Sequence, residues 1–216
     1  MSKLLTLEEG TILTRFARQS IESYITNKQI LELPDTTSKA LLENRGVFVT
    51  LKKYQSGNQK DSTLRGCIGR LQPSSNSHQN SIPLLEATRQ AALSSAFEDP
   101  RFPPVRDEEL NSILVEVSVL TIPEELQIKD RTKLHDQITI GKHGLIIEGK
   151  GWHKGLLLPQ VAPEQEWNAE EFLQGCCQKA GMASDCYLNT ENRILTFEAQ
   201  IFAETSIRGK IIERKF

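Results

Sequence analysis

A predicted strand at residues 63–71 contains the sequence Leu64-Arg65-Gly66-Cys67-Ile68-Gly69, in which one cysteine lies between two glycines. The preceding segment, residues 47–54, alternates in polarity and is rich in β-branched side chains, which favours a second strand. The polar residues 55–62 between the two segments are typical of a hairpin tip. This hairpin most constrains the fold, because two strands joined in this way pair antiparallel.

Helices are predicted on both sides of the hairpin in sequence. Residues 7–27 place apolar side chains at helical spacing behind a capping box, in which Thr6 is the N-cap and Glu9 reaches back. Residues 82–97 form a second predicted helix, whose small side chains on one face permit close packing on a sheet. The other predicted elements are a short helix (39–44), strands (113–120, 138–147, 155–161 and 195–201), turns with a short helix (122–137), a helix that starts at Asn168 and ends before Gly181, and a short edge element in the tail 208–216.

Strands in adjacent groups, mixed with about three helices, indicate an α+β fold. We expect a mainly antiparallel sheet flanked by helices, not a doubly wound parallel sheet. The chain of 216 residues is long enough to bury a real core within one domain that spans residues 1–216. A change of composition near residue 122 is the only candidate for a lobe boundary.

The bulk composition limits the classes of partner. The formal net charge is -2 and no run of lysine or arginine occurs, so we expect no general attraction for nucleic acid or for an anionic membrane. The N-terminus lacks the apolar run of a signal peptide, and no segment approaches the roughly 18 apolar residues of a spanning helix. Four cysteines, two of them adjacent and none in a CxxC pair, predict reduced thiols in a cytoplasmic protein.

The cysteine of the central strand is a candidate nucleophile. If Leu64 and Ile68 point into the core, Arg65 and Cys67 project together from the other face of the strand. A guanidinium beside the thiol would lower its pKa and favour the thiolate, which is the nucleophilic form. Under this hypothesis Cys67 is the catalytic residue and Arg65 is its electrostatic partner.

The two glycines are candidate ligand-binding positions. Gly66 and Gly69 have no side chain, so a ligand would be able to approach the backbone and its N–H groups. Leu71 is out of phase with the preceding apolar residues, which predicts a bulge at Gly69. The alternative is that Cys67 is a small buried apolar residue and that the glycines serve tight packing.

A second fixed cation is predicted in the proline-flanked turn at residues 99–104. Arg101 is a candidate ligand for a carboxylate or phosphate, and Asp99 would hold it in place. The alternative is a structural Asp–Arg clamp of the turn. A nucleophile would also require a base, for which the sequence offers four histidines without choosing among them: His78, His135, His143 and His153.

The histidines do not indicate a metal site. His135 and His143 match no compact ligand spacing, so no metal and no cofactor are expected. The phosphate-cradling GxxxxGK motif, the GxSxG elbow and a GxGxxG motif after a strand are all absent from the sequence. The three enzyme classes that depend on these motifs are therefore disfavoured.

Several motifs in the same order resemble the AMMECR domain over about residues 8–205. The central motif is followed by Ala96-Phe97-Glu98-Asp99-Pro100-Arg101-Phe102-Pro103-Pro104, Glu109-Leu110, residues 117–121, residues 141–147, and Leu158-Pro159-Gln160-Val161-Ala162 with Trp167 and Phe172-Leu173. The resemblance implies an α+β fold with a larger and a smaller lobe, and it implies no known catalytic mechanism. In microbes the family is called protein A of the AmmeMemoRadiSam system, which implies a Memo-family protein and a radical SAM enzyme as functional associates.

Two functional hypotheses follow. In the first, a groove at Leu64–Gly69 binds or modifies a small anionic or carbonyl-bearing ligand, with Asp99 and Arg101 as neighbours. In the second, the chain is a non-catalytic interaction or scaffold module for Memo-type or radical SAM partners, and the motif only shapes a surface or a core.

Overall fold

The computed structural model describes residues 4–36, 38–54, 62–71 and 82–215. The chain divides into two compact units, which we call unit 1 (Met1–Leu120 with Gln200–Arg214) and unit 2 (Thr121–Ala199 with residues 215–216). The predicted hairpin tip lies outside the described residues except for Ser62. The single domain over residues 1–216, with its candidate lobe boundary near residue 122, stays a prediction.

A five-stranded sheet forms the frame of unit 1. Its order is β2 (Thr63–Arg70), β1 (Val47–Lys53), β3 (Ile113–Leu120), β8 (Ala199–Glu204) and β9 (Ile211–Arg214). β1 pairs antiparallel with both β2 and β3, and β8 pairs antiparallel with β9. The predicted hairpin and the predicted α+β class are therefore confirmed, and β2, which contains the cysteine motif, is an edge strand.

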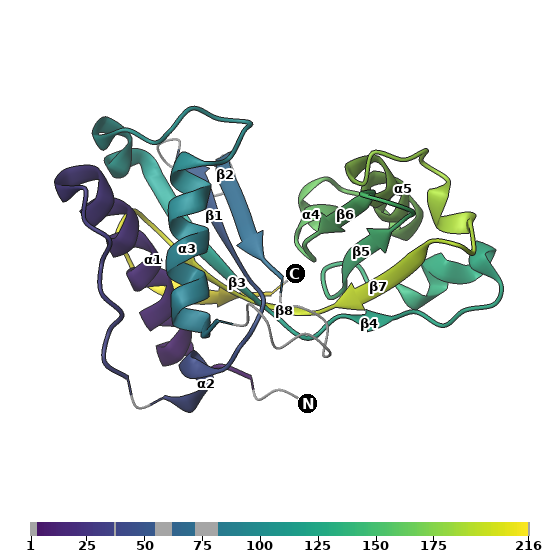
Figure 1. The fold of residues 1–216 in the computed structure, drawn as a ribbon, viewed down its shortest axis with the longest axis horizontal. Coiled ribbons are helices and arrows are strands. Elements are labelled where there is room, and N and C mark those ends of the chain that lie inside the picture. The colour runs from purple at the N-terminus through teal and green to yellow at the C-terminus, as the bar shows by residue number, and fades with distance from the viewer. Residues whose placement is uncertain (1–3, 37, 55–61, 72–81, 216) are drawn as a thin grey trace. The chain divides into compact units, whose positions relative to one another are not determined.

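Helices α1 (Leu7–Asn27) and α3 (Leu84–Phe97) cover one face of this sheet (Figure 1), and the short α2 (Lys39–Leu42) precedes β1. The capping box at the start of α1 is confirmed, because the Thr6 hydroxyl accepts from the Glu9 N–H and the Glu9 carboxylate accepts from the Thr6 N–H. The apolar residues that these helices and β1 bury between them include Leu13, Phe16, Ala17, Ile21, Val47, Val49, Leu51, Leu84, Leu85, Ala91 and Ala92.

Helix α3 approaches β2 closely through small residues. A Cβ atom placed on Gly66 would lie only 2.2 Å from the carbonyl oxygen of Ser95. The Ser95 hydroxyl accepts a hydrogen bond from the Ile68 N–H (2.8 Å) and donates one to the Val49 carbonyl (2.6 Å). The helix is thus bonded to both strands of the hairpin, and the predicted small-residue face of this helix is what makes the contact.

Unit 2 contains a four-stranded sheet in the order β4 (Glu124–Glu125), β7 (Arg193–Phe197), β5 (Gly144–Glu148) and β6 (Lys154–Leu157). All of its strand pairs are antiparallel. Helix α5 (Ala169–Lys179) packs on β5 and β6, with Phe172, Leu173 and Cys176 fully buried. The remaining elements are α4 (Val161–Glu164) and the 3-10 helices η2 (Asp107–Ser112, in unit 1), η3 (Arg131–Gln137) and η4 (Cys186–Leu188).

Three predicted strands in this part of the chain have the wrong limits. The strand predicted at 138–147 begins only at Gly144, because a turn with Gly141 at φ 80° precedes it. The strand predicted at 155–161 ends at Leu157, because α4 begins at Val161. The strand predicted at 195–201 is two strands in two different sheets, and the Glu198 N–H between them donates to the Thr121 hydroxyl (2.9 Å) instead of continuing a ladder.

The predicted reduced state of the cysteines is wrong for one pair. Cys177 and Cys186 form a disulfide with a sequence separation of nine residues, whereas Cys67 and Cys176 are free. The chain reverses after α5 at Gly181, which has a φ of 70°. The Met182 N–H then returns to the Cys177 carbonyl (3.0 Å). This reversal brings Cys186 back to the helix, and no spacing motif in the sequence announces it.

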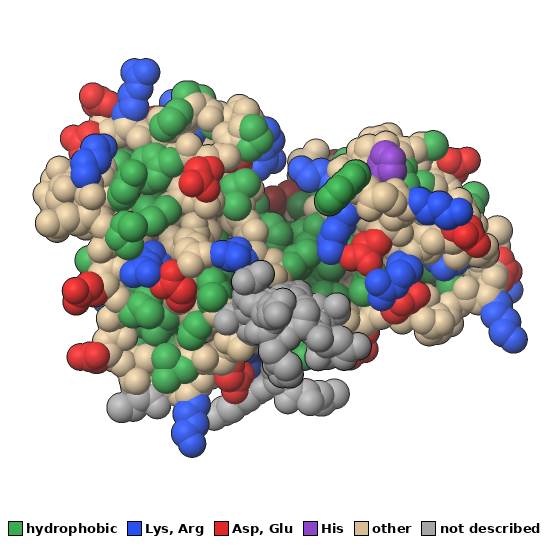
Figure 2. All heavy atoms as spheres, viewed as in Figure 1, with side chains coloured by type: hydrophobic (Ala, Val, Ile, Leu, Met, Phe, Trp, Pro, Cys, Tyr) green, Lys and Arg blue, Asp and Glu red, His purple; other side chains and the backbone are tan. Residues whose placement is uncertain are grey.

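None of the helices described is both long enough and apolar enough to cross a membrane. On the face shown in Figure 2, Lys and Arg side chains are interspersed with Asp and Glu side chains. This mixture matches the small formal net charge of -2.

The contact between Gly66 and Ser95 gives a stability prediction. Because a methyl group on residue 66 would collide with a backbone carbonyl, Gly66→Ala must displace α3, and we expect it to lower the free energy of unfolding by about 3 kcal/mol. Urea unfolding monitored by circular dichroism measures this change. The matched control is Gly46→Ala, where the nearest atom is the tip of Leu120 at 3.3 Å and the expected loss is below about 1 kcal/mol. Equal losses for the two variants would contradict the close approach.

Candidate functional site

A bulge in β2 determines how the cysteine motif presents its side chains. The register with β1 is regular from Val47↔Arg70 to Leu51↔Gly66 and then shifts, so that Lys52 pairs with Leu64. Arg65 is therefore the extra residue of the bulge. The predicted bulge at Gly69 is wrong, because Gly69 pairs regularly with Phe48.

The Arg65 side chain links β2 to residues 102–109 of unit 1. Its Nε and Nη2 donate to the two carboxylate oxygens of Glu109 (2.8 and 2.9 Å), and Nη2 also donates to the Pro103 carbonyl (2.9 Å). The guanidinium lies 5.8 Å from the centre of the Phe102 ring, and the residue is only 7% exposed. Arg65 lowers the pKa of the Glu109 carboxyl through this hydrogen-bonded pair.

The expected pairing of Arg65 with the cysteine is consequently wrong in its geometry. The bulge removes Arg65 from the regular alternation of the strand, and its guanidinium is bound by Glu109. The charged groups that act on the pKa of the Cys67 thiol are instead Arg101, Glu116 and Asp99. The catalytic role assigned to Cys67 is a separate question and stays a prediction.

The Cys67 backbone is held by Asp99 and Arg101. The Cys67 N–H donates to Asp99 Oδ2 (2.8 Å), and Arg101 Nη2 donates to the Cys67 carbonyl (3.2 Å). The same guanidinium binds both carboxylate oxygens of Asp99, at 2.9 Å from Nε and 2.7 Å from Nη2. Two side chains thus occupy the outer hydrogen-bonding groups of an edge strand, where another strand would otherwise pair.

The Asp99–Arg101 pair behaves as the structural clamp that was the alternative interpretation, although it clamps β2 as well as its own turn. Asp99 is 4% exposed, and the Arg101 guanidinium beside it lowers the pKa of its carboxyl to about 2. The Arg101 side chain keeps 43% of its surface exposed. Within the described part of the chain, its Nη1 has no hydrogen-bond partner.

The Cys67 thiol is half-buried and accepts a hydrogen bond from the Thr50 hydroxyl at 3.3 Å. Burial raises the pKa of the thiol above its ordinary value. The Thr50 hydrogen bond and the Arg101 charge lower this pKa, while the carboxylates of Glu116 and Asp99 raise it. Because the net direction is upward, the thiol is neutral at physiological pH.

A row of polar side chains continues across the same face of the sheet. Thr50 is the cross-strand partner of Cys67 on one side and of Glu116 on the other. Glu116 Oε2 accepts from Arg214 Nη1 (2.6 Å) and lies 3.7 Å from Lys52 Nζ. The sequence interpretation did not include Thr50 and Glu116, and only the register of β1 with its two neighbours identifies them.

The two motif glycines make room for protein atoms. A Cβ on Gly66 would meet Ser95, and a Cβ on Gly69 would lie 2.2 Å from the Phe48 ring. Both positions fit the tight-packing alternative, and a ligand-binding role for them stays a prediction.

The candidate bases have other neighbours. His153 Nδ1 lies 3.1 Å from the Ala180 carbonyl, and His143 Nδ1 accepts from the Thr139 N–H (3.2 Å). His135 Nε2 lies 3.2 Å from Asp136 Oδ1. His78 lies outside the described residues. The three described histidines all lie in unit 2, whereas Cys67 lies in unit 1.

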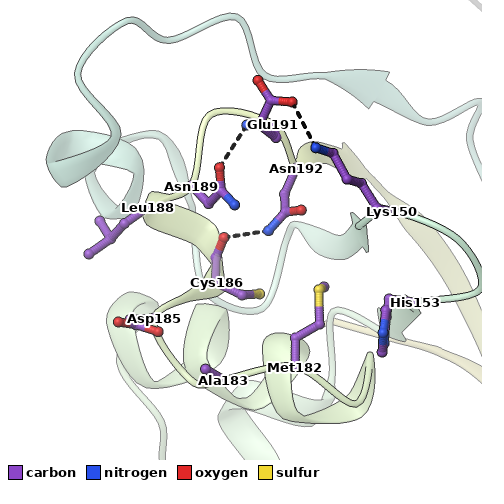
Figure 3. Close-up of a pocket in the computed structure, with 10 residues that line it drawn as sticks. All are labelled: Lys150, His153, Met182, Ala183, Asp185, Cys186, Leu188, Asn189, Glu191 and Asn192. Carbon is purple, nitrogen blue, oxygen red and sulfur yellow. Dashed lines mark hydrogen bonds and ion pairs between the residues drawn. The ribbon is translucent and has the colours of Figure 1, made fainter.

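Unit 2 contains an open pocket of about 630 Å³ that the sequence did not predict (Figure 3). Its lining includes Lys150, His153, Met182, Asp185, Cys186 and Glu191. Lys150 Nζ lies 3.4 Å from Glu191 Oε2 at the rim, and Asn192 Nδ2 donates to the Cys186 carbonyl (2.7 Å). The pocket lining therefore includes one of the two cysteines of the disulfide.

The chain matches known proteins over nearly its whole length. The family model described as AMMECR1 matches residues 14–202. Protein MJ0810 of Methanocaldococcus jannaschii is 46% identical over 213 residues, which cover 99% of this chain and 98% of that protein. Protein MK0488 of Methanopyrus kandleri is 46% identical, with 99% and 97% covered. The crystal structure of the uncharacterized protein PH0010 from Pyrococcus horikoshii is similar with a TM-score of 0.88 and 43% identity, and covers 97% of this chain and 98% of that one.

The low pKa of Asp99 predicts an acid-dependent contribution to stability. The pKa of Asp99 in the folded protein is about 2, which is below the ordinary 3.8. The ionised carboxylate therefore stabilises the fold above about pH 4, and this stabilisation is lost as the pH falls through about 2. The shift corresponds to about 2 kcal/mol. Urea unfolding of the wild type and of Asp99→Asn should therefore show a difference that is largest above about pH 4 and shrinks toward about pH 2. Arg101→Gln removes the partner and should reduce the same pH dependence; a constant difference between the wild type and Asp99→Asn would contradict the assignment.

The environment of Cys67 predicts a thiol that is alkylated slowly at neutral pH. We expect its alkylation by iodoacetamide to reach half its maximal rate at a pH above the ordinary thiol pKa, because burial disfavours the thiolate. Thr50→Val should move this midpoint further upward, and Glu116→Gln should move it downward, since the hydroxyl lowers and the carboxylate raises the pKa. Peptide mapping after timed alkylation measures the rate, with Cys67→Ser as the blank. A midpoint below about 8.5 would restore the activated nucleophile.

Proposed function

The chain belongs to the AMMECR1 family, and we propose that it binds a small carbonyl-bearing ligand non-covalently beside Cys67. The observation that carries this proposal is the pair of hydrogen-bond donors at this point of β2. Arg101 is rigidly held through Asp99 and the Cys67 carbonyl, and it keeps Nη1 without a partner in the described part of the chain. The neutral Cys67 thiol already accepts from Thr50, so its own S–H is available to donate.

The charge balance around these donors favours a neutral carbonyl oxygen over an anion. The carboxylate of Asp99 compensates the guanidinium of Arg101, and the carboxylate of Glu116 acts on the same thiol. An anionic ligand would gain little attraction from a compensated pair. A carbonyl oxygen needs only donors of fixed direction, which a clamped guanidinium supplies.

Binding is better supported than chemical modification. Burial keeps the pKa of Cys67 above its ordinary value, so the residue stays in the thiol form, and the hydrogen bond that its sulfur accepts comes from the Thr50 hydroxyl. A nucleophilic mechanism needs a thiolate or an adjacent base. The proposal therefore assigns Cys67 a recognition role and Arg101 an orienting role.

A second candidate function is a non-catalytic interaction module in a system with Memo-family and radical SAM proteins. The observation in its favour is that Arg65, Gly66 and Asp99 all serve the internal architecture of unit 1. A motif used in this way shapes a surface without supplying reactive groups. The identity of the partners rests on the family relation alone.

The ligand proposal is tested by heteronuclear NMR titration with two small probes of similar size, N-methylacetamide and acetate. We expect N-methylacetamide to shift the amide signal of Cys67 and the side-chain Nε–H signal of Arg101, and acetate to leave both nearly unchanged. Arg101→Lys retains the charge but loses the planar fork, and it should abolish the response to N-methylacetamide. The response should survive in Glu43→Gln, a substitution at an exposed carboxylate outside the β2 clamp.

Two results would redirect the proposal. A response to acetate that exceeds the response to N-methylacetamide would favour an anion site. If neither probe shifts the two signals, and if a Memo-family protein co-elutes equally with the wild type and with Cys67→Ser, the interaction module becomes the better description.

A further inference from the structure

The disulfide of unit 2 is asymmetric in its access to solvent. Cys177 lies within α5 and is fully buried, whereas Cys186 is 8% exposed and lines the open pocket. Figure 3 shows the sulfur of Cys186 directed toward the same space as the sulfur of Met182. Of the two cysteines of the bond, Cys186 thus lines the pocket and Cys177 is not among the lining residues.

We propose that the Cys177–Cys186 disulfide is a reversible thiol-exchange site, at which an external dithiol attacks Cys186 through this pocket. A pocket of about 630 Å³ is large enough for a small dithiol or for the tip of a thiol-bearing protein loop. This role is independent of the ligand site in unit 1.

The exchange is balanced by two thiols of the incoming reductant. The first thiolate attacks Sγ of Cys186, which forms a mixed disulfide and releases Cys177 as a thiolate that takes up a proton. The second thiolate of the reductant then attacks its own sulfur in the mixed disulfide, which releases Cys186 as a thiolate. Two electrons pass to the protein pair, and the reductant leaves as its cyclic or internal disulfide.

The pocket lining includes both positive and negative side chains, which have opposite effects on an approaching thiolate. The ammonium of Lys150 attracts it, while the carboxylates of Asp185 and Glu191 repel it. Lys150 is the lysine of this lining, its side chain is 84% exposed, and its ammonium is paired with Glu191 at 3.4 Å. Removal of its charge should slow the attack, and removal of the Asp185 charge should accelerate it.

The neighbouring free thiol does not compete. Cys176 precedes Cys177 in α5, is fully buried, and has a pKa raised to about 12 by burial. A thiol of that pKa supplies almost no thiolate at neutral pH and does not attack the disulfide. Reduction consequently depends on an external reagent, and disulfide scrambling within unit 2 is suppressed.

Reduction would loosen the segment between the two cysteines without detaching its ends. The Met182 N–H still bonds to the Cys177 carbonyl, and Asn192 Nδ2 still bonds to the Cys186 carbonyl. Residues 183–185 lose the disulfide as a tether, although the Cys186 N–H still donates to the Ala183 carbonyl (3.0 Å), and Ala183 and Asp185 line the pocket. The redox state of the pair would therefore set the shape of this pocket.

The first experiment compares single thiols in a Cys67→Ser background. Cys177→Ser leaves the thiol of Cys186, and Cys186→Ser leaves the thiol of Cys177. We expect Ellman's reagent to react with Cys186 at least about tenfold faster than with Cys177, because access follows the pocket. Cys176 is present in both variants and reports folding, since its reaction would indicate an opened unit 2. If Cys176 stays unreactive and Cys177 reacts as fast as Cys186 or faster, the proposal is overturned.

The second experiment uses the full chain with its disulfide intact. It tests the proposal even if unit 2 unfolds in one of the single-cysteine variants. The rate of reduction by dithiothreitol should rise linearly with its concentration, as expected for attack on the folded protein. A rate that saturates would show that unfolding precedes attack and would overturn the proposal. At low ionic strength Lys150→Gln should slow the reaction roughly threefold, while the matched variant Lys129→Gln, outside the pocket, should leave it unchanged. Equal rates for the two lysine variants would overturn the proposed route of attack.

Discussion

The peptide unit of Cys67 is the point on which the architecture of unit 1 depends. Asp99 and Arg101 bind its N–H and its carbonyl from the outer edge of the sheet, and Ser95 bonds to the next residue, Ile68. The helix α3 and the proline-rich turn that follows it are therefore fixed to the same two residues of β2. A glycine at position 66 is required because the helix backbone comes too close for a side chain. Stability and the geometry of the proposed ligand site have the same origin.

The two cysteines with proposed roles differ in the property on which each role depends. Cys67 is half-buried, and its thiol is held by a hydroxyl in an environment that favours the neutral form. Such a group donates a hydrogen bond better than it attacks a carbon atom. Cys186 is already oxidised, and its relevant property is access from a pocket. Neither role requires an activated thiolate on the protein.

Sequence patterns were sufficient for the elements whose signals are local. The capping box at Thr6 and the alternation in β3 predicted helix α1 and strand β3 with the observed limits. Errors occurred where tertiary contacts decide the outcome. The strand predicted at 195–201 is interrupted at Glu198, where a hydrogen bond to Thr121 replaces the ladder, and no local pattern reports this.

At the candidate site, too, the sequence pattern failed where a tertiary feature decides the direction of a side chain. The alternation of the sequence predicted Arg65 and Cys67 on one face of the strand. In the structure Arg65 is the extra residue of a bulge, and its guanidinium binds Glu109, which is 44 positions away in the sequence. A bulge changes every side-chain direction beyond it, so a functional assignment from period-two spacing fails when the bulge is placed wrongly. Thr50, by contrast, follows from the register of β1 and β2 once the bulge is known. The motif therefore fixes a register and a clamp, and the proposed ligand recognition rests on the Cys67 side chain and on Arg101 Nη1, which has no partner among the described residues.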